Sequence, residues 1–265
     1  MRKIYFFGDS FTVDYDTNWT WTRNLAEKLR VNGLVNHSMI GTSNDWILMK
    51  IRESLSDITK DDIVVVVLTS VYRYWFFKDK PELSNYMISN WDNFAKETNN
   101  KDAVDAVKGY VNYIQRDDLD AFRFEHQVAW LKGTQQRYGF TLLLIPGFTM
   151  PIDYTDMIPV IGDLTATVSN AEFMTPKDDE EWYSSGIDTR YNHMLRCNHE
   201  IMAQKCANSI LTGQPLDLQI GFNRHILKGH ERLTHKELGS KLIATSNELY
   251  GNESKPTKFT HWLKS

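Results

Sequence analysis

The residues with the clearest chemical potential lie near the start of the chain, where Gly8-Asp9-Ser10 directly follows a short apolar run. A serine in a tight turn after a strand is exposed at the edge of a sheet, and its own N–H can face an anion. When a histidine takes its proton, the serine oxygen becomes a nucleophile that attacks acyl carbonyls. The same tripeptide is also an ordinary turn sequence, so both roles are open for Ser10.

A second segment of chemical interest is 36–44, Asn-His-Ser-Met-Ile-Gly-Thr-Ser-Asn, which contains Gly41. A tetrahedral intermediate develops a negative oxygen that must be met by preset N–H groups, and the N–H of Gly41 is a candidate donor. The alternative interpretation is a plain Gly-Ser turn that caps the following helix at Asn44.

Alternating strands and helices are expected to position these segments. Strands are predicted at residues 3–7, 34–40, 62–69 and 140–145, and helices at 21–31, 45–55 and 119–138, the last with Asp118 as N-cap. Four consecutive valines make 62–69 hydrophobic on both faces, as a central parallel strand is. The order predicts an α/β fold: a three-layer α/β/α sandwich with a mostly parallel, flavodoxin-like sheet. Ligand sites in such sheets lie at the carboxyl ends of the strands.

Three further segments complete the expected single domain of residues 1–265. An aromatic-rich insert is expected at about 72–111 and a proline-containing loop at about 150–187. A helical extension is expected at about 215–265, with a helix from Thr234 that begins with a capping box. The tryptophans that could line a substrate cleft are Trp75, Trp91 and Trp182.

With Gly8-Asp9-Ser10 after the first strand and the Gly41 segment after the second, the chain resembles the SGNH/GDSL hydrolase family. The resemblance implies that family's α/β/α fold and an ester hydrolase whose nucleophile is Ser10. It also implies that the N–H groups of Ser10 and Gly41 bind the oxyanion, and that no metal or organic cofactor is needed.

The family's third block, Gly-x-Asn-Asp after strand three, is absent. Leu68-Thr69-Ser70-Val71-Tyr72-Arg73 stands there, similar to a Thr-Ser…Arg variant of some members. Candidate replacements for the missing donor are the Asn44 side chain and the hydroxyls of Thr69 and Ser70. Arg73 is a candidate for binding an anionic substrate group, although an ion pair is the commoner role of an arginine.

The general base in this family is a histidine just before a late helix. In this chain the resemblance favours His193 as the base, with Asp188, the nearest preceding acid, orienting it. His230 and His235 are the alternative bases. Neither His193 nor His230 has the family's aspartate three residues before it, so a Ser-His dyad is a further alternative. His199 falls on a helix stripe with Met202 and Cys206, which predicts a packed structural histidine.

Composition excludes several classes of protein. With 30 Lys+Arg against 34 Asp+Glu among 265 residues, the net charge is −4, and the basic excess typical of nucleic-acid binding is missing. The apolar runs are too short to cross a bilayer, and the N-terminal run is too short for a signal peptide. A cytoplasmic or particle-associated protein is therefore expected. Cys197 and Cys206 have neither the number of a disulfide scaffold nor the spacing of a zinc site.

The resemblance thus implies a serine esterase or deacylase that acts on a small-molecule or carbohydrate acyl ester, such as an O-acetyl group on a carbohydrate. The altered third and final blocks leave a second interpretation open, in which the protein keeps the fold as a catalytically inactive binding or structural protein.

Overall fold

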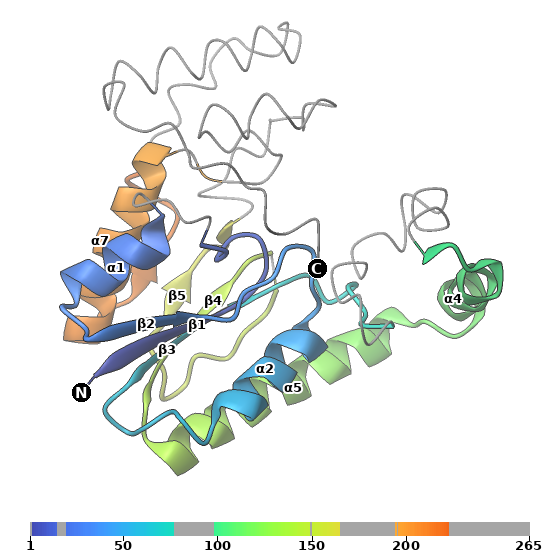
Figure 1. Cartoon of the computed structure of the whole chain (residues 1–265), viewed down its shortest axis with the longest axis horizontal. Helices are drawn as coiled ribbons and strands as arrows, with labels where there is room; N and C mark the ends of the chain where they lie inside the picture. The colour runs from blue at the N-terminus through green and yellow to red at the C-terminus, as the bar shows by residue number, and fades with distance from the viewer. Residues whose placement is uncertain are drawn as a thin grey trace, which may run out of the picture. The chain divides into compact units, whose positions relative to one another are not determined.

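The computed structural model describes residues 2–14, 20–76, 98–148, 150–164, 194 and 196–222 (Figure 1). Contacts within the chain define two compact units. Unit 1 comprises Met1–Val13 and Val31–Met157, and unit 2 comprises Asp14–Arg30 and Ile158–Ser265.

Unit 1 is built on a parallel four-stranded sheet. Its strands are β1 (Lys3–Phe7), β2 (Gly33–Asn36), β3 (Ile63–Leu68) and β4 (Thr141–Pro146), in the order β2-β1-β3-β4. All three pairings are parallel, which confirms the predicted α/β class with a parallel sheet. β1 and β3 are the central strands, so the segments that follow them emerge in the middle of one sheet edge.

β2 is shorter than the predicted strand at 34–40. Its regular pairing ends at Asn36, whose side-chain oxygen accepts the backbone N–H of Ser38 at 2.9 Å. An asparagine that bonds to the backbone two residues ahead forms a turn and interrupts the strand. The chain still follows β1 beyond this point, because the N–H of Met39 donates to the carbonyl of Gly8.

The core of unit 1 lies between the sheet and two helices, α2 (Asn44–Ser54) and α5 (Asp117–Tyr138), which lie side by side in Figure 1. Every residue of β3 is 0% exposed, as predicted for a central strand. α5 begins before the predicted Leu119, since acidic residues in a first turn favour a helix N-terminus. The N-cap is Arg116, and Asp118 lies inside the first turn, so its predicted capping role is wrong.

The aromatic insert predicted at 72–111 contains a regular helix, α4 (Lys101–Tyr113), in its second half. Asn100 caps α4 by accepting the N–H of Ala103. Val104 and Val107 of α4 pack with Tyr74 in a small cluster of their own. Residues 77–97, including Trp91, lie outside the described part of the chain.

The Tyr74 hydroxyl joins this cluster to α5. Tyr74 is 3% exposed and its hydroxyl donates to the carboxylate of Asp120, which also accepts from Gln115. Burial and the neighbouring Asp120 carboxylate both raise the pKa of Tyr74, so the hydroxyl keeps its proton. The Arg123 guanidinium lies 4.5 Å from the Tyr74 ring centroid.

A Tyr74→Phe variant should therefore be destabilised by about 1–3 kcal/mol, because the buried Asp120 carboxylate loses its closest donor. Urea denaturation measures the loss. Tyr72→Phe is the matched control, since Tyr72 is 43% exposed, and its midpoint should stay at the wild-type value. Equal midpoints for the two variants would contradict the assigned role of the Tyr74 hydroxyl.

At the amino edge of the sheet, Asp62 ties β1 to β3. The carboxylate is buried and accepts the N–H of Lys3 at 2.6 Å and both the N–H and the hydroxyl of Thr59 at 2.8 and 2.9 Å. Burial acts to raise the pKa of Asp62, but these hydrogen bonds outweigh it and lower the pKa below the ordinary 3.8. The stability that this carboxylate contributes is therefore present above its unfolded-state pKa and is lost as the pH falls through the lowered folded-state pKa.

Replacement of Asp62 by asparagine should cost about 1–3 kcal/mol at neutral pH, since an amide cannot accept all three bonds. The difference between wild type and variant should shrink once the pH falls below 3.8. Urea unfolding across that range tests this, with the exposed neighbour Asp61→Asn as control. A deficit that stays constant with pH would show that the Asp62 charge is not its source.

Unit 2 contains α1 (Trp21–Lys28), α7 (Arg196–Thr212) and a short parallel pair, β5 (Val160–Ile161) with β6 (Leu216–Asp217). β5 lies inside the loop predicted at 150–187, and β6 lies at the start of the extension predicted at 215–265. The helix predicted from Thr234 is outside the described residues.

His199 belongs to the contact between α1 and α7. It is 8% exposed, and its Nδ1 accepts the N–H of Trp21 at 3.0 Å, at the first residue of α1. Met202 and Cys206 on the same helix are 0% exposed. The predicted packed structural histidine is confirmed. Within the described ranges, no helix is both long and apolar enough to cross a membrane.

Candidate active site

Ser10 lies in a tight turn at the carboxyl end of β1. The turn is closed by Thr12, whose N–H and hydroxyl both donate to the carbonyl of Asp9, at 3.0 and 2.9 Å. Gly8 is required by close approach: a Cβ at this position would lie 2.3 Å from the Thr12 hydroxyl oxygen and 3.1 Å from Cβ of Val67. Ser10 itself is 9% exposed. The turn therefore holds Ser10 in one backbone conformation at the middle of the sheet edge.

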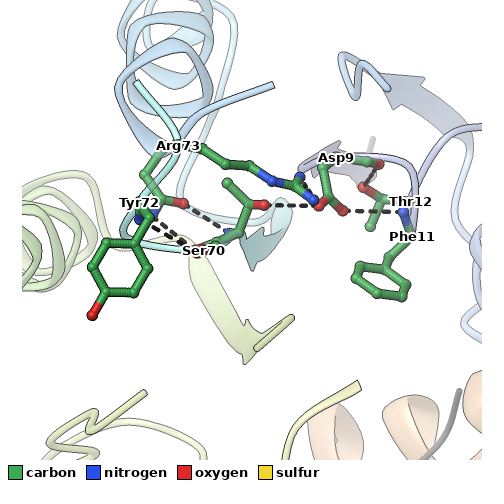
Figure 2. A network of polar contacts seen from close by, with 8 residues as sticks. Asp9, Phe11, Thr12, Ser70, Tyr72 and Arg73 are labelled. Atoms are coloured by element: carbon green, nitrogen blue, oxygen red, sulfur yellow. Dashed lines mark hydrogen bonds and ion pairs between the residues drawn. The ribbon is translucent and has the colours of Figure 1, made fainter. Parts of the chain in front are cut away.

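The Asp9 side chain holds this turn through several hydrogen bonds (Figure 2). It is 0% exposed, and one carboxylate oxygen accepts the N–H of Phe11 at 3.1 Å. The other oxygen accepts the Thr69 hydroxyl at 2.9 Å and a guanidinium N–H of Arg73 at 2.7 Å. Asp9 thus connects the turn after β1, which contains Ser10, to the segment after β3, which contains Thr69 and Arg73.

Arg73 is largely enclosed, with 14% of its side chain exposed. Its Cζ lies 5.0 Å from the ring centroid of Phe148, which follows β4, and Phe148 meets Phe11 edge-on at 6.0 Å. Burial lowers the pKa of Arg73, and the Asp9 carboxylate acts in the opposite direction. The guanidinium remains charged at neutral pH, and the Asp9 carboxylate balances that charge.

The segment after β2 is attached to the same edge at both ends. At its start, the Asn36 side-chain amide donates to the carbonyl of Thr12 at 2.7 Å. At its end, Asn44 makes two bonds with the backbone of Thr69, one from its amide to the carbonyl at 2.9 Å and one from the Thr69 N–H at 2.8 Å. Gly41 between them has φ +72°, a conformation that favours glycine. The helix cap at this point is Ser43.

The structure brings six of the residues predicted for the site to one edge of unit 1: Ser10, Gly41, Asn44, Thr69, Ser70 and Arg73. The side chains of four of these residues form hydrogen bonds to other groups of the protein. Asn44 and Thr69 are engaged as described, Arg73 pairs with Asp9, and the Ser70 hydroxyl accepts the N–H of Tyr72 at 3.3 Å. Their predicted oxyanion or substrate contacts remain predictions, as does the Gly41 donor role.

The predicted base and its partner, His193 and Asp188, lie outside the described residues, as do the alternatives His230 and His235. Three histidines are described. His199 accepts the N–H of Trp21, His37 stacks on Phe7 with ring centroids 5.4 Å apart, and Nδ1 of His126 lies 2.8 Å from the carbonyl oxygen of Phe122. Burial and then the Lys50 charge lower the pKa of His37, so it is neutral at pH 7. The described ranges contain no group of three or more His, Cys, Asp or Glu that could hold a metal ion.

Two features of this edge had no counterpart in the sequence analysis. The first is the role of Asp9; an aspartate that bonds to the N–H two residues ahead is a recognisable turn former, but nothing local points to Arg73 as its partner. The second is Thr42, next to Gly41, which is 0% exposed and whose hydroxyl has no hydrogen-bond partner in the described part of the chain. Buried hydroxyls are normally paired, so the Thr42 hydroxyl is an exception to that rule.

No protein-family model matches the chain, and no curated protein does. Among solved structures, the acetyl xylan esterase AlAXEase is 13% identical, with 97% of this chain and 86% of that chain covered and a TM-score of 0.34. A lipolytic protein of the G-D-S-L family from Desulfitobacterium hafniense DCB-2 is 12% identical, covering 78% and 98%, with a TM-score of 0.33. Phospholipase A1 from Streptomyces albidoflavus NA297 is 10% identical, covering 80% and 73%, with a TM-score of 0.30. These likenesses are distant, and at such TM-scores no assignment of family or chemistry rests on them.

Proposed function

We propose that the protein is a serine ester hydrolase, an esterase or deacylase, with Ser10 as the nucleophile. The observation that carries the proposal is the buried Asp9 carboxylate, which fixes the Ser10 turn at the carboxyl end of a central parallel strand. A nucleophile needs a fixed orientation toward the reacting carbonyl, and this arrangement supplies one. The glycine-containing segment after β2 joins the same edge through Asn36 and Asn44.

The proposed reaction has two steps. The Ser10 oxygen attacks the acyl carbonyl while His193 takes the serine proton, and the tetrahedral oxyanion is met by the N–H groups of Ser10 and Gly41. His193 returns the proton to the departing alcohol oxygen as the carbon–oxygen bond breaks. Water then attacks the acyl-enzyme by the same route and releases the acid and free Ser10. Asp188 orients His193 in this proposal.

The substrate class we propose is a neutral acyl ester, on a small molecule or a carbohydrate, and an O-acetyl group on a carbohydrate is the first candidate. Its support is the motif resemblance at Ser10 and Gly41. The charge balance of the site agrees with it, because Asp9 and Arg73 neutralise one another.

Labelling with a fluorophosphonate tests the nucleophile directly. The reagent should modify the wild-type protein once, and digestion followed by mass spectrometry should place the adduct on the peptide that contains Ser10. His193→Ala should abolish labelling, and His230→Ala should leave it intact. An unlabelled wild-type protein would overturn the proposal in favour of a catalytically inactive binding or structural protein. An adduct on another serine would show that Ser10 is not the nucleophile.

A further inference from the structure

We infer that Arg73 is a positioning residue that holds Asp9, and through it the Ser10 turn, and that it does not bind an anionic group of the substrate. The inference rests on the proposed function and narrows its substrate class to esters that need no carboxylate or phosphate near the acyl group. From its place in the sequence, Arg73 was a candidate for binding the substrate.

Arg73 is the counter-charge of a buried carboxylate. The guanidinium N–H of Arg73 lies 2.7 Å from a carboxylate that is itself 0% exposed and has no solvent to replace this partner. A substrate anion that drew Arg73 away from Asp9 would leave the buried carboxylate without its counter-charge. Removing one partner of a buried pair is strongly unfavourable, so Arg73 is committed to Asp9.

The segment that carries Arg73 is anchored on both sides. On one side, Thr69 is held through its backbone by Asn44. On the other side, the neighbouring Tyr74 is held through its hydroxyl by Asp120. The backbone N–H of Arg73 donates to the carbonyl of Ser70 at 3.2 Å, which closes a turn between the two anchors. The segment therefore directs the guanidinium to one place, and Figure 2 shows it reaching across to Asp9.

The Asp9 carboxylate connects Arg73 to the backbone around Ser10. Asp9 accepts from Phe11 and from Arg73 on its two carboxylate oxygens, and Ser10 lies between Asp9 and Phe11 in the chain. A change in the position of the carboxylate therefore shifts the backbone on both sides of Ser10. Misplacement of a reacting group by about 1 Å can lower a rate about 100-fold.

Two esters separate positioning from substrate binding: p-nitrophenyl acetate, which is neutral, and p-nitrophenyl hemisuccinate, which carries a carboxylate on its acyl group. Arg73→Met should lower kcat for both by the same factor, about 10- to 100-fold, and leave the ratio of the two KM values unchanged. Arg73→Lys should recover part of the rate on both. Arg116→Met is the matched control, because the pair that Arg116 forms with Asp118 is exposed. A loss confined to the hemisuccinate and expressed in KM would overturn the inference.

A readout that needs no turnover keeps this test apart from that of the proposed function. In ¹⁵N-resolved NMR spectra, the guanidinium N–H signals of Arg73, assigned from Arg73→Lys, should exchange slowly with water. Asp9→Asn should remove that protection, and added succinate should not shift the signals. If the wild-type protein neither hydrolyses ester nor reacts with fluorophosphonate, the proposed function fails. If the signals instead respond to succinate and not to Asp9→Asn, the inference about Arg73 fails.

Discussion

Replacement of Ser10 by alanine should lower hydrolysis of p-nitrophenyl acetate by at least about 1,000-fold, which is the largest effect expected of any single substitution in this protein. The alanine removes the attacking oxygen and leaves the turn intact, since the bonds that close it belong to Asp9 and Thr12. Folding should therefore be unaffected, and the loss should appear in kcat. Steady-state kinetics together with circular dichroism of the purified variant measure both.

The matched control for this variant is Ser54→Ala. Ser54 is also a buried serine of unit 1, but its hydroxyl donates to the carbonyl of Lys50 in the last turn of α2, and it has no place in the proposed chemistry. Its activity should equal that of the wild type. If Ser10→Ala and Ser54→Ala were equally active, Ser10 would not be the nucleophile.

Asp9→Asn should be among the most destabilising isosteric changes in unit 1, at about 3 kcal/mol. The amide keeps an acceptor for the N–H of Phe11, but it removes the negative charge that pairs with Arg73 and leaves that cation enclosed. Loss of one partner from a buried pair costs about 3–5 kcal/mol, and the 14% exposure of the Arg73 side chain places the expected value at the lower end. Urea denaturation gives the change from the shift in midpoint.

An exposed aspartate provides the comparison for Asp9. Asp153 also meets a cation, Lys132, at 3.2 Å, but its side chain is 72% exposed, and exposed pairs contribute little. Asp153→Asn should therefore unfold near the wild-type midpoint. The double variant Asp9→Asn with Arg73→Met should be less destabilised than the sum of the single variants, because the two residues form one interaction. Additive losses would mean that the pair is not coupled.

The parts of the fold that could be predicted well are those that depend on the residue pattern of a single segment. The valines of β3 are hydrophobic on both faces and β-branched, and they form a fully buried central strand. Ile47 and Ile51 share one helical stripe and pack into the core as expected. The end of β2 was misplaced because it depends on the side chain of Asn36, which forms a turn in place of further pairing. α4 was missed because aromatic and polar residues concealed its small apolar stripe.

The candidate site divides along the same line. Ser10 and Gly41 could be placed at this edge from the sequence because each carries a local turn signal at the end of a strand. The ion pair between Asp9 and Arg73 could not be predicted, since the two residues lie 64 positions apart and their contact depends on β1 and β3 being neighbours in the sheet. The two bonds between the Asn44 side chain and the backbone of Thr69 could likewise not be predicted, because only the folded sheet brings these groups within reach.

The central position of β1 has a consequence for the order in which the site can form during synthesis. Asp9 leaves the ribosome before its two side-chain partners, which follow 60 and 64 residues later. Contacts of such long separation require closure of a large loop, and they form late in folding. In the nascent chain, the turn around Ser10 therefore lacks these contacts until β3 has been synthesised and has paired with β1. A fragment that stops before Thr69 should contain Ser10 but not the turn conformation that Asp9 fixes in the full chain.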